Sequence, residues 1–129
     1  MTGIEKITDG PNSVDLTIRR REEPSAGEYV FRLVAAAGRI MDGSSLPAPE
    51  AALAEVERFG ADIFFPTPGP PKLCTQQYGG PQVAVVTGIF HGRRVHAMFK
   101  RTDGCEIGRW NSLAALLGGT PGASGQSRT

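Results

Sequence analysis

The chain has 129 residues, enough for one domain with a single hydrophobic core. Its 14 basic and 13 acidic residues leave a formal net charge of +1, so charge gives no reason to expect a nucleic acid or membrane surface as partner. No apolar run reaches the roughly 20 residues that span a bilayer.

The first segment, residues 1–12, is polar, contains glycine and proline, and is expected to be a flexible arm. Its opening residues, MTGIEKITDG, lack the apolar central region of a secretory signal peptide. If the protein is exported, we expect that the signal peptide has already been removed.

Two strands are expected next. Val14, Leu16 and Ile18 alternate with polar residues, which is the period of a half-buried strand. A second strand is predicted at Tyr29–Ala36 after a charged turn. Residues 37–49 are rich in glycine, serine and proline and are expected to form a loop.

One helix is predicted, at Glu50–Phe59. Pro49 suits its first turn, Gly60 suits a C-terminal stop, and both Glu50 and Glu55 are expected on the solvent side. The apolar residues that recur at helical spacing are Ala52, Val56, Phe59 and Ile63.

Proline dominates residues 64–73, FFPTPGPPKL, and predicts a stiff, extended surface segment, because proline removes backbone donors. Two strands in hairpin order follow at Gln82–Phe90 and Arg94–Lys100. His91-Gly92 forms the turn between them, where glycine supplies a positive φ.

Leu113–Leu117 is expected to form either a final strand or a helical turn, and the Gly/Ser/Thr-rich tail, 118–129, to be disordered. The folded domain is therefore expected at 13–117. Its order, β-β-loop-α-loop-β-β-β, predicts an antiparallel α+β domain.

An enzyme is disfavoured, and neither a metal nor another cofactor is expected. His91 and His96 have no third ligand placed by the local sequence. There is no G-x-S-x-G motif, and the glycines form neither a phosphate loop nor a dinucleotide fingerprint. Cys74 and Cys105, without neighbours at metal-binding spacing, form either a disulfide or two buried thiols, and nothing local decides between them.

One long segment, residues 74–107, carries a specific pattern: CTQQYGGPQVAVVTGIFHGRRVHAMFKRTDGCEI. It resembles the Streptomyces subtilisin inhibitor family. The resemblance covers roughly residues 13–117, and upstream it is looser. The residues that carry it are Cys74, Tyr78, Pro81, Gly88, Phe90, Gly92, Arg93, Arg94, Val95, Cys105 and Glu106.

This resemblance implies a five-stranded antiparallel sheet with one main helix packed on it, usually in a homodimer formed through sheet surfaces. It implies a protein secreted by an actinobacterium that inhibits subtilisin-type serine proteases as a slow-turnover substrate. It also implies a Cys74–Cys105 disulfide and a bait bond at Gln76–Gln77. The implied reactive-site loop is Leu73, Cys74, Thr75, Gln76, Gln77 and Tyr78.

The side chain of Gln76 favours a subtilisin-like target. It has no charge for the acidic pocket of trypsin-like enzymes and no ring for a chymotrypsin-like slot, whereas a broad subtilisin pocket accepts its unbranched stem. Leu73 suits the preference of subtilisin-like clefts for an apolar residue three positions before the bait residue.

The chain departs from the family pattern in three ways. A second family disulfide is replaced by Ala35 and Leu53, which indicates core packing in place of the bridge. The bait residue is Gln76, where methionine or lysine is usual. Thr75 stands where proline is common, and an extra glycine at position 79 or 80 predicts a looser far side of the loop.

Two other functions remain open on the same fold. The chain could be a non-inhibitory protein-interaction domain, or it could inhibit another protease class through a different surface. A cytoplasmic form is a further alternative, in which the cysteines would be reduced.

Overall fold

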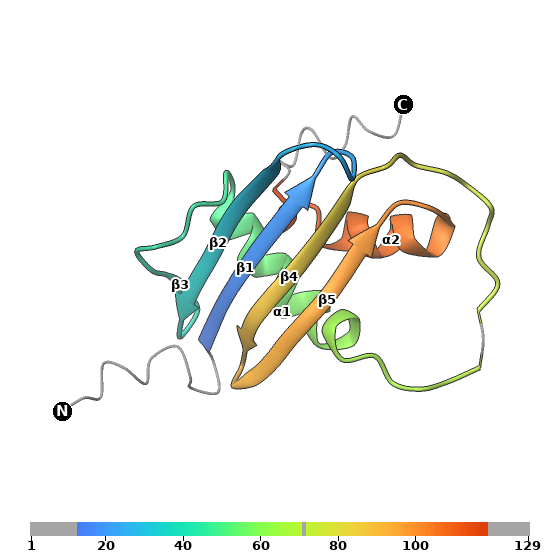
Figure 1. The fold of residues 1–129 in the computed structure, drawn as a ribbon. Helices are drawn as coiled ribbons and strands as arrows, with labels where there is room; N and C mark the ends of the chain where they lie inside the picture. Colours follow the sequence, from blue (N-terminus) through green and yellow to red (C-terminus); the bar gives the residue numbers. More distant parts are fainter. Residues whose placement is uncertain (1–12, 71, 119–129) are drawn as a thin grey trace.

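The computed structural model describes residues 13–70 and 72–118. The predicted arm, 1–12, and the predicted tail apart from Gly118 lie outside the described residues. The elements, in chain order, are β1 (Ser13–Arg21), β2 (Glu28–Ala36), β3 (Arg39–Ile40), α1 (Pro49–Phe64), β4 (Val83–Phe90), β5 (Arg93–Lys100) and α2 (Gly104–Ser112) (Figure 1).

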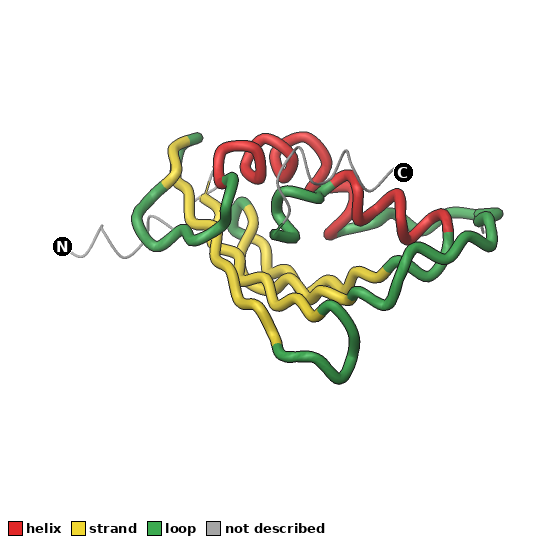
Figure 2. The backbone as a smooth tube through the Cα atoms, turned by 90° about the horizontal axis from the view of Figure 1, so that it is seen from above, coloured by secondary structure: helices red, strands yellow, loops and turns green. Residues whose placement is uncertain are grey.

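The five strands form one antiparallel sheet in the order β3-β2-β1-β4-β5, so the predicted α+β class is confirmed. Both helices lie on the same side of this sheet (Figure 2). Among residues 13–70 and 72–118, no helix lies on the opposite face of the sheet (Figure 2). None of the helices in the described part of the chain is long and apolar enough to cross a membrane.

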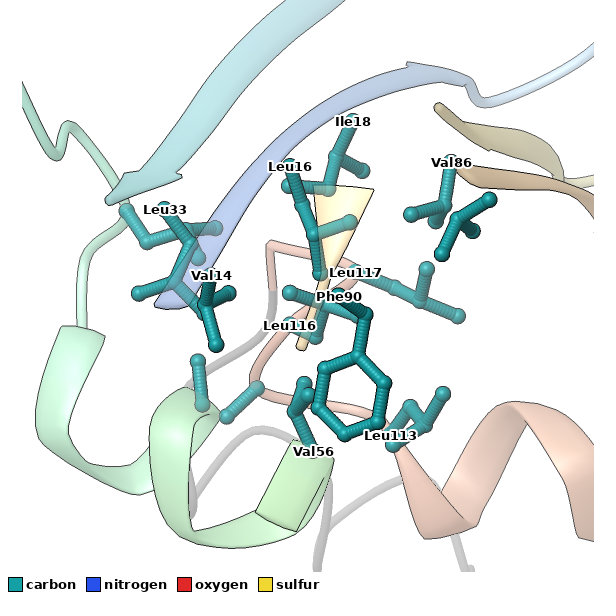
Figure 3. Close-up of a cluster of buried hydrophobic side chains, with 14 of the residues drawn as sticks. Val14, Leu16, Ile18, Leu33, Val56, Val86, Phe90, Leu113, Leu116 and Leu117 are labelled. Carbon is teal, nitrogen blue, oxygen red and sulfur yellow. The ribbon is translucent and has the colours of Figure 1, made fainter. Parts of the chain in front are cut away.

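The alternating residues of β1 form the centre of the core. Val14, Leu16 and Ile18 are fully buried, and Leu16 lies opposite Leu33 of β2. The sequence had also placed these three residues on the buried face of a strand. The other side chains shown in the core come from α1, β4 and the segment after α2: Val56, Val86, Phe90, Leu113, Leu116 and Leu117 (Figure 3).

The main helix, α1, starts at Pro49 as predicted but continues past Gly60 to Phe64. Gly60 is therefore not a helix stop. A Cβ at this position would lie 3.3 Å from the Phe64 and Phe90 rings, so glycine here permits close packing of the helix on the sheet.

Glu55 of α1 was expected on the solvent side, and this expectation is wrong. Its carboxylate accepts hydrogen bonds from the amides of Ala115 (2.9 Å) and Leu116 (3.3 Å). Glu55 therefore ties α1 to the apolar segment that closes the core.

Three further differences concern the elements themselves. The short strand β3 lies within 37–49, which was predicted to be a loop, and it is the fifth strand of the sheet. Leu113–Leu117 is a buried series of turns after α2, in which the Leu117 amide donates to the Leu113 carbonyl at 2.9 Å, so of the two expected conformations the strand is wrong and the helical turn agrees. A short apolar run is buried equally well in several conformations, so its pattern does not choose among them. The second helix, α2, was not predicted.

Two predictions agree with the structure: core packing in place of a second disulfide, and the hairpin turn at His91-Gly92. Ala35 and Leu53 are both buried in the same core cluster. His91 and Gly92 have φ values of 50° and 83°, which is the left-handed conformation of a tight hairpin turn.

Candidate functional site

The candidate site is the long connection between α1 and β4. Pro66, Pro68 and Pro70 make its first part an exposed, extended segment without helix or strand. Figure 1 shows the connection running outside the body of the fold and returning past α2. The described side chains from Lys72 to Gly79 are all exposed.

The two largest apolar side chains of this stretch point away from the core. Leu73 is 102% exposed and Tyr78 is 68% exposed. Such exposure is unfavourable in a resting protein, and it makes both side chains available to a partner.

A first anchor holds the loop at Cys74 and Thr75. A disulfide joins Cys74 to Cys105, with 5.3 Å between the Cα atoms. The carbonyl oxygen of Thr75 accepts a hydrogen bond from the amide of Gly104 at 2.9 Å. Since Gly104 and Cys105 begin α2, this anchor is the start of a helix.

A second anchor holds the loop at Gly79. The amide of Gly79 donates to the backbone carbonyl of Arg101 at 2.7 Å, and the Arg101 Nε donates back to the Gly79 carbonyl at 3.3 Å. A Cβ at Gly79 would lie 2.9 Å from Ile107 of α2, so the absent side chain lets the loop lie against the helix. The far side of the loop is thus held at the glycine that was expected to loosen it.

Between the two anchors lie Gln76, Gln77 and Tyr78, which are all exposed. Within this span the Thr75 hydroxyl lies 3.4 Å from Gln77 Oε1, a contact local to the loop. The peptide bond Gln76–Gln77 is therefore in the middle of a short, accessible segment whose two ends are fixed to the body.

The helix that supports both anchors is itself well fixed. The Asp103 carboxylate caps its first turn by accepting from the Glu106 amide at 2.9 Å, and Trp110 is buried. Asp103 three residues before Glu106 is a recognisable helix start, so this pattern could have predicted α2. The role of Arg101 has no comparable sequence signal, because its partner Gly79 is distant in the chain.

Metal-ligating groups gather at one place in the described residues. Ligand atoms of Cys74, Asp103 and Cys105 lie within 4.8 Å of one another. Both sulfurs belong to the disulfide and Asp103 caps α2, so this group acts as a structural unit. His91 instead lies 3.0 Å from the Glu57 carboxylate, and His96 is exposed on β5.

No protein-family model matches the chain, and no curated protein gives a significant match. Among solved structures, a chain of the crystal structure of Streptomyces caespitosus sermetstatin in complex with Bacillus licheniformis subtilisin is similar. The TM-score is 0.48 with 20% sequence identity, over 84% of this chain and 97% of that chain. A similarity of this size assigns no function by itself.

Proposed function

We propose that the protein is a secreted, substrate-like inhibitor of subtilisin-type serine proteases, and that it presents the bond Gln76–Gln77 to the enzyme. One observation carries the proposal: an exposed span of three residues lies between two anchors, and both anchors join the loop to α2 or to Arg101 just before it. The resemblance of residues 74–106 to the subtilisin inhibitor family supports the same position for the bond.

The loop suits a protease cleft in its shape. Proteases bind substrates as extended strands and fill pockets with alternating side chains. Leu73 and Tyr78 are free to enter such pockets, one on each side of the bond. The uncharged stem of Gln76 fits a broad subtilisin pocket better than the acidic pocket of a trypsin-like enzyme.

The two anchors explain how such a loop would inhibit. Ordering a free loop costs about 0.5–1.5 kcal/mol per immobilised side chain, and a loop already held by Cys74 and Gly79 avoids most of that cost. Once cut, both new ends would stay attached to the body of the inhibitor. Reversal of the cut would then compete with release.

In the cleavage step, the serine oxygen of the enzyme bonds to the carbonyl carbon of Gln76 while the bond to the Gln77 nitrogen breaks. That nitrogen leaves as an amine with the proton taken from the serine hydroxyl. In the reverse step the same amine attacks the acyl-enzyme and restores the peptide bond. Water attack on the acyl-enzyme is the alternative, and it completes hydrolysis.

Secretion is part of the proposal. The Cys74–Cys105 disulfide supports it, because disulfides persist in oxidising compartments and are rare in the cytosol. The exposed position of Cys74 makes the bond accessible to cytosolic reductants. Thiol counting on protein isolated from the culture medium tests this point.

We also propose a homodimer formed through the uncovered face of the sheet. Val30 and Met98 are 51% and 60% exposed on this face, and Val85 pairs directly with Met98. A second copy would cover these apolar side chains. Analytical ultracentrifugation of the native chain and of Met98→Asp tests the dimer.

The same uncovered face supports a second candidate function, a protein-interaction domain that does not inhibit. The exposed cation Lys100 lies two positions after Met98 on the same face of β5 and would suit an acidic protein surface. Such a domain would have no need of an intact Gln76–Gln77 bond.

The deciding experiment is a titration of a subtilisin with the native chain, followed by mass spectrometry of the mixture. Stoichiometric inhibition with a small fraction cut between Gln76 and Gln77 is the expected result. Rapid degradation, or no effect on the enzyme, would favour the interaction domain. Inhibition that substitutions at Gln76 and Tyr78 leave unchanged would indicate a different inhibitory surface.

A further inference from the structure

We infer that Arg101 is a positioning residue for the proposed reactive bond: it holds the chain after Gln77 so that the cut bond re-forms faster than water hydrolyses it. This inference rests on the proposed function, and concerns a residue that lies outside the loop itself.

Arg101 contacts the loop with both its backbone and its side chain. Its carbonyl oxygen accepts from the Gly79 amide at 2.7 Å, and its Nε donates to the Gly79 carbonyl at 3.3 Å. Both backbone polar groups of one loop residue are therefore satisfied by a single residue.

The guanidinium of Arg101 is held from its other side by α2. Its Nη1 donates to the side chain of Asn111 at 3.3 Å, and its central carbon lies 5.6 Å from the centroid of the Trp110 ring. Trp110 is buried, so these contacts connect the loop to the core rather than to another loop. Arg101 itself is half-buried between β5 and α2.

The position of Gly79 matters for the reaction because Gly79 is only two residues after the proposed bond. After cleavage the new amino group belongs to Gln77, two positions before Gly79. Without an anchor at Gly79, the next regular hydrogen-bonded segment is β4, which starts at Val83, six positions after Gln77.

The volume that a flexible tether explores grows roughly as the 3/2 power of its length, so a threefold longer tether lowers the local concentration of the amine about fivefold. Arg101→Ala removes the side-chain hydrogen bond and keeps the backbone bond. Fivefold is the limit for loss of the whole anchor, so we expect religation to slow by at least about twofold and by no more than about fivefold, with a matching gain in net hydrolysis.

The test compares the native chain with Arg101→Ala, Arg101→Lys and Asn111→Ala. Two quantities are measured with subtilisin: the initial inhibition constant, and the rate at which intact chain is hydrolysed at Gln76–Gln77 under catalytic amounts of enzyme. Chain that has been cut and purified is also returned to the enzyme, and the fraction that becomes intact again is measured by mass spectrometry. Arg94→Ala, an exposed cation on β5, is the matched control.

The expected result is about two- to fivefold faster hydrolysis and a smaller re-formed fraction for Arg101→Ala, with a smaller change in the initial inhibition constant. The lysine ammonium can donate to Gly79 but lacks the planar set of donors with which the guanidinium also bonds Asn111. The hydrolysis rate of Arg101→Lys should therefore be intermediate. Asn111→Ala should shift hydrolysis in the same direction by less. These three variants should melt within a few degrees of the native chain. A variant that was partly unfolded would instead raise the inhibition constant and the hydrolysis rate together.

If the native chain inhibits and Arg101→Ala is hydrolysed and religated at the native rates, the role of Arg101 is wrong and the proposed function stands. The role is equally wrong if Arg94→Ala gives the same change. If the native chain does not inhibit subtilisin at all, the proposed function fails, and the role of Arg101 fails with it.

Discussion

The amide nitrogen of Gly104 lies 2.9 Å from the carbonyl oxygen of Thr75, so the first residue of α2 holds the loop directly before Gln76. This contact is close because Gly104 has no side chain. A Cβ there would lie 2.0 Å from the Thr75 hydroxyl oxygen.

Gly104→Ala should therefore weaken inhibition without unfolding the protein. The added Cβ would overlap the Thr75 hydroxyl and lie 3.4 Å from the Thr75 nitrogen, so Thr75 must shift against α2, which weakens the hydrogen bond and displaces the Gln76 carbonyl. A loss of about 1–3 kcal/mol of binding corresponds to about a 5- to 150-fold higher inhibition constant for subtilisin. Gly108→Ala in the same helix is the control, because a Cβ at Gly108 contacts nothing within 4 Å. Equal inhibition by the two variants would show that the anchor at Thr75 is unimportant.

Gln76→Lys should create an inhibitor of trypsin. A lysine ammonium at this position can pair with the carboxylate in the trypsin pocket, and the rest of the fold is untouched because Gln76 is exposed. The expected gain over the native chain is at least tenfold in trypsin inhibition. The matched variant, Gln77→Lys, should give much less. No gain from Gln76→Lys would place the reactive bond elsewhere.

Under the proposed function, replacement of both cysteines, Cys74→Ser with Cys105→Ser, should turn the chain into an ordinary substrate of subtilisin. The disulfide closes a loop of about thirty residues and is expected to contribute about 2–4 kcal/mol to the free energy of unfolding. More important for function, the chain before Gln76 loses a covalent anchor. Rapid cleavage between Gln76 and Gln77, followed over time by mass spectrometry, is the measurement. A double variant that stays intact and inhibitory would assign the loop's rigidity to its hydrogen bonds alone.

Glu55 should make stability depend on pH in a way that is unusual for a glutamate. Burial raises the pKa of its carboxyl above the ordinary 4.5, although the amides of Leu116 and Ala115 oppose the shift by hydrogen bonding to the carboxylate. The folded state therefore favours the protonated form. Its contribution to stability is full below pH 4.5 and is lost as pH rises through the raised pKa.

Glu55→Gln should remove that decline, since the amide oxygen still accepts both hydrogen bonds and carries no charge. Its stability relative to the native chain should increase as pH rises from about 4 to about 7. Urea unfolding at several pH values measures the difference, and Glu50→Gln, exposed on the same helix, controls for the lost charge. Parallel stability curves for Glu55→Gln and the native chain would contradict the expectation.

Most strands and the main helix could be predicted from the sequence because their side chains report local burial. Val14, Leu16 and Ile18 alternate along β1, and all three are fully buried. The short strand β3 could not be predicted, since Arg39 and Ile40 pair with β2 through backbone hydrogen bonds that two residues cannot encode as a pattern.

The candidate site also has one part that the sequence predicts and one part that it does not. The exposed loop residues around Gln76 follow from a contiguous motif and its family resemblance. The Cys74–Cys105 disulfide also follows from that resemblance. The hydrogen bonds of the two anchors do not, because Gly79 meets Arg101, and Thr75 meets Gly104, only after β5 and α2 have packed. With α2 unpredicted, the extra glycine indicated a looser loop, whereas in the structure it is the residue that fits against the helix.

The three residues between the anchors can be substituted without disturbing the fold. Gln76, Gln77 and Tyr78 are exposed, and the residues that hold the loop, within 101–107, lie on α2 or directly before it. Random change at these three positions would therefore be nearly neutral for folding and, under the proposed function, would alter the choice of enzyme. A library randomised at them on this scaffold should yield folded members almost throughout, so that new target preferences can be selected directly.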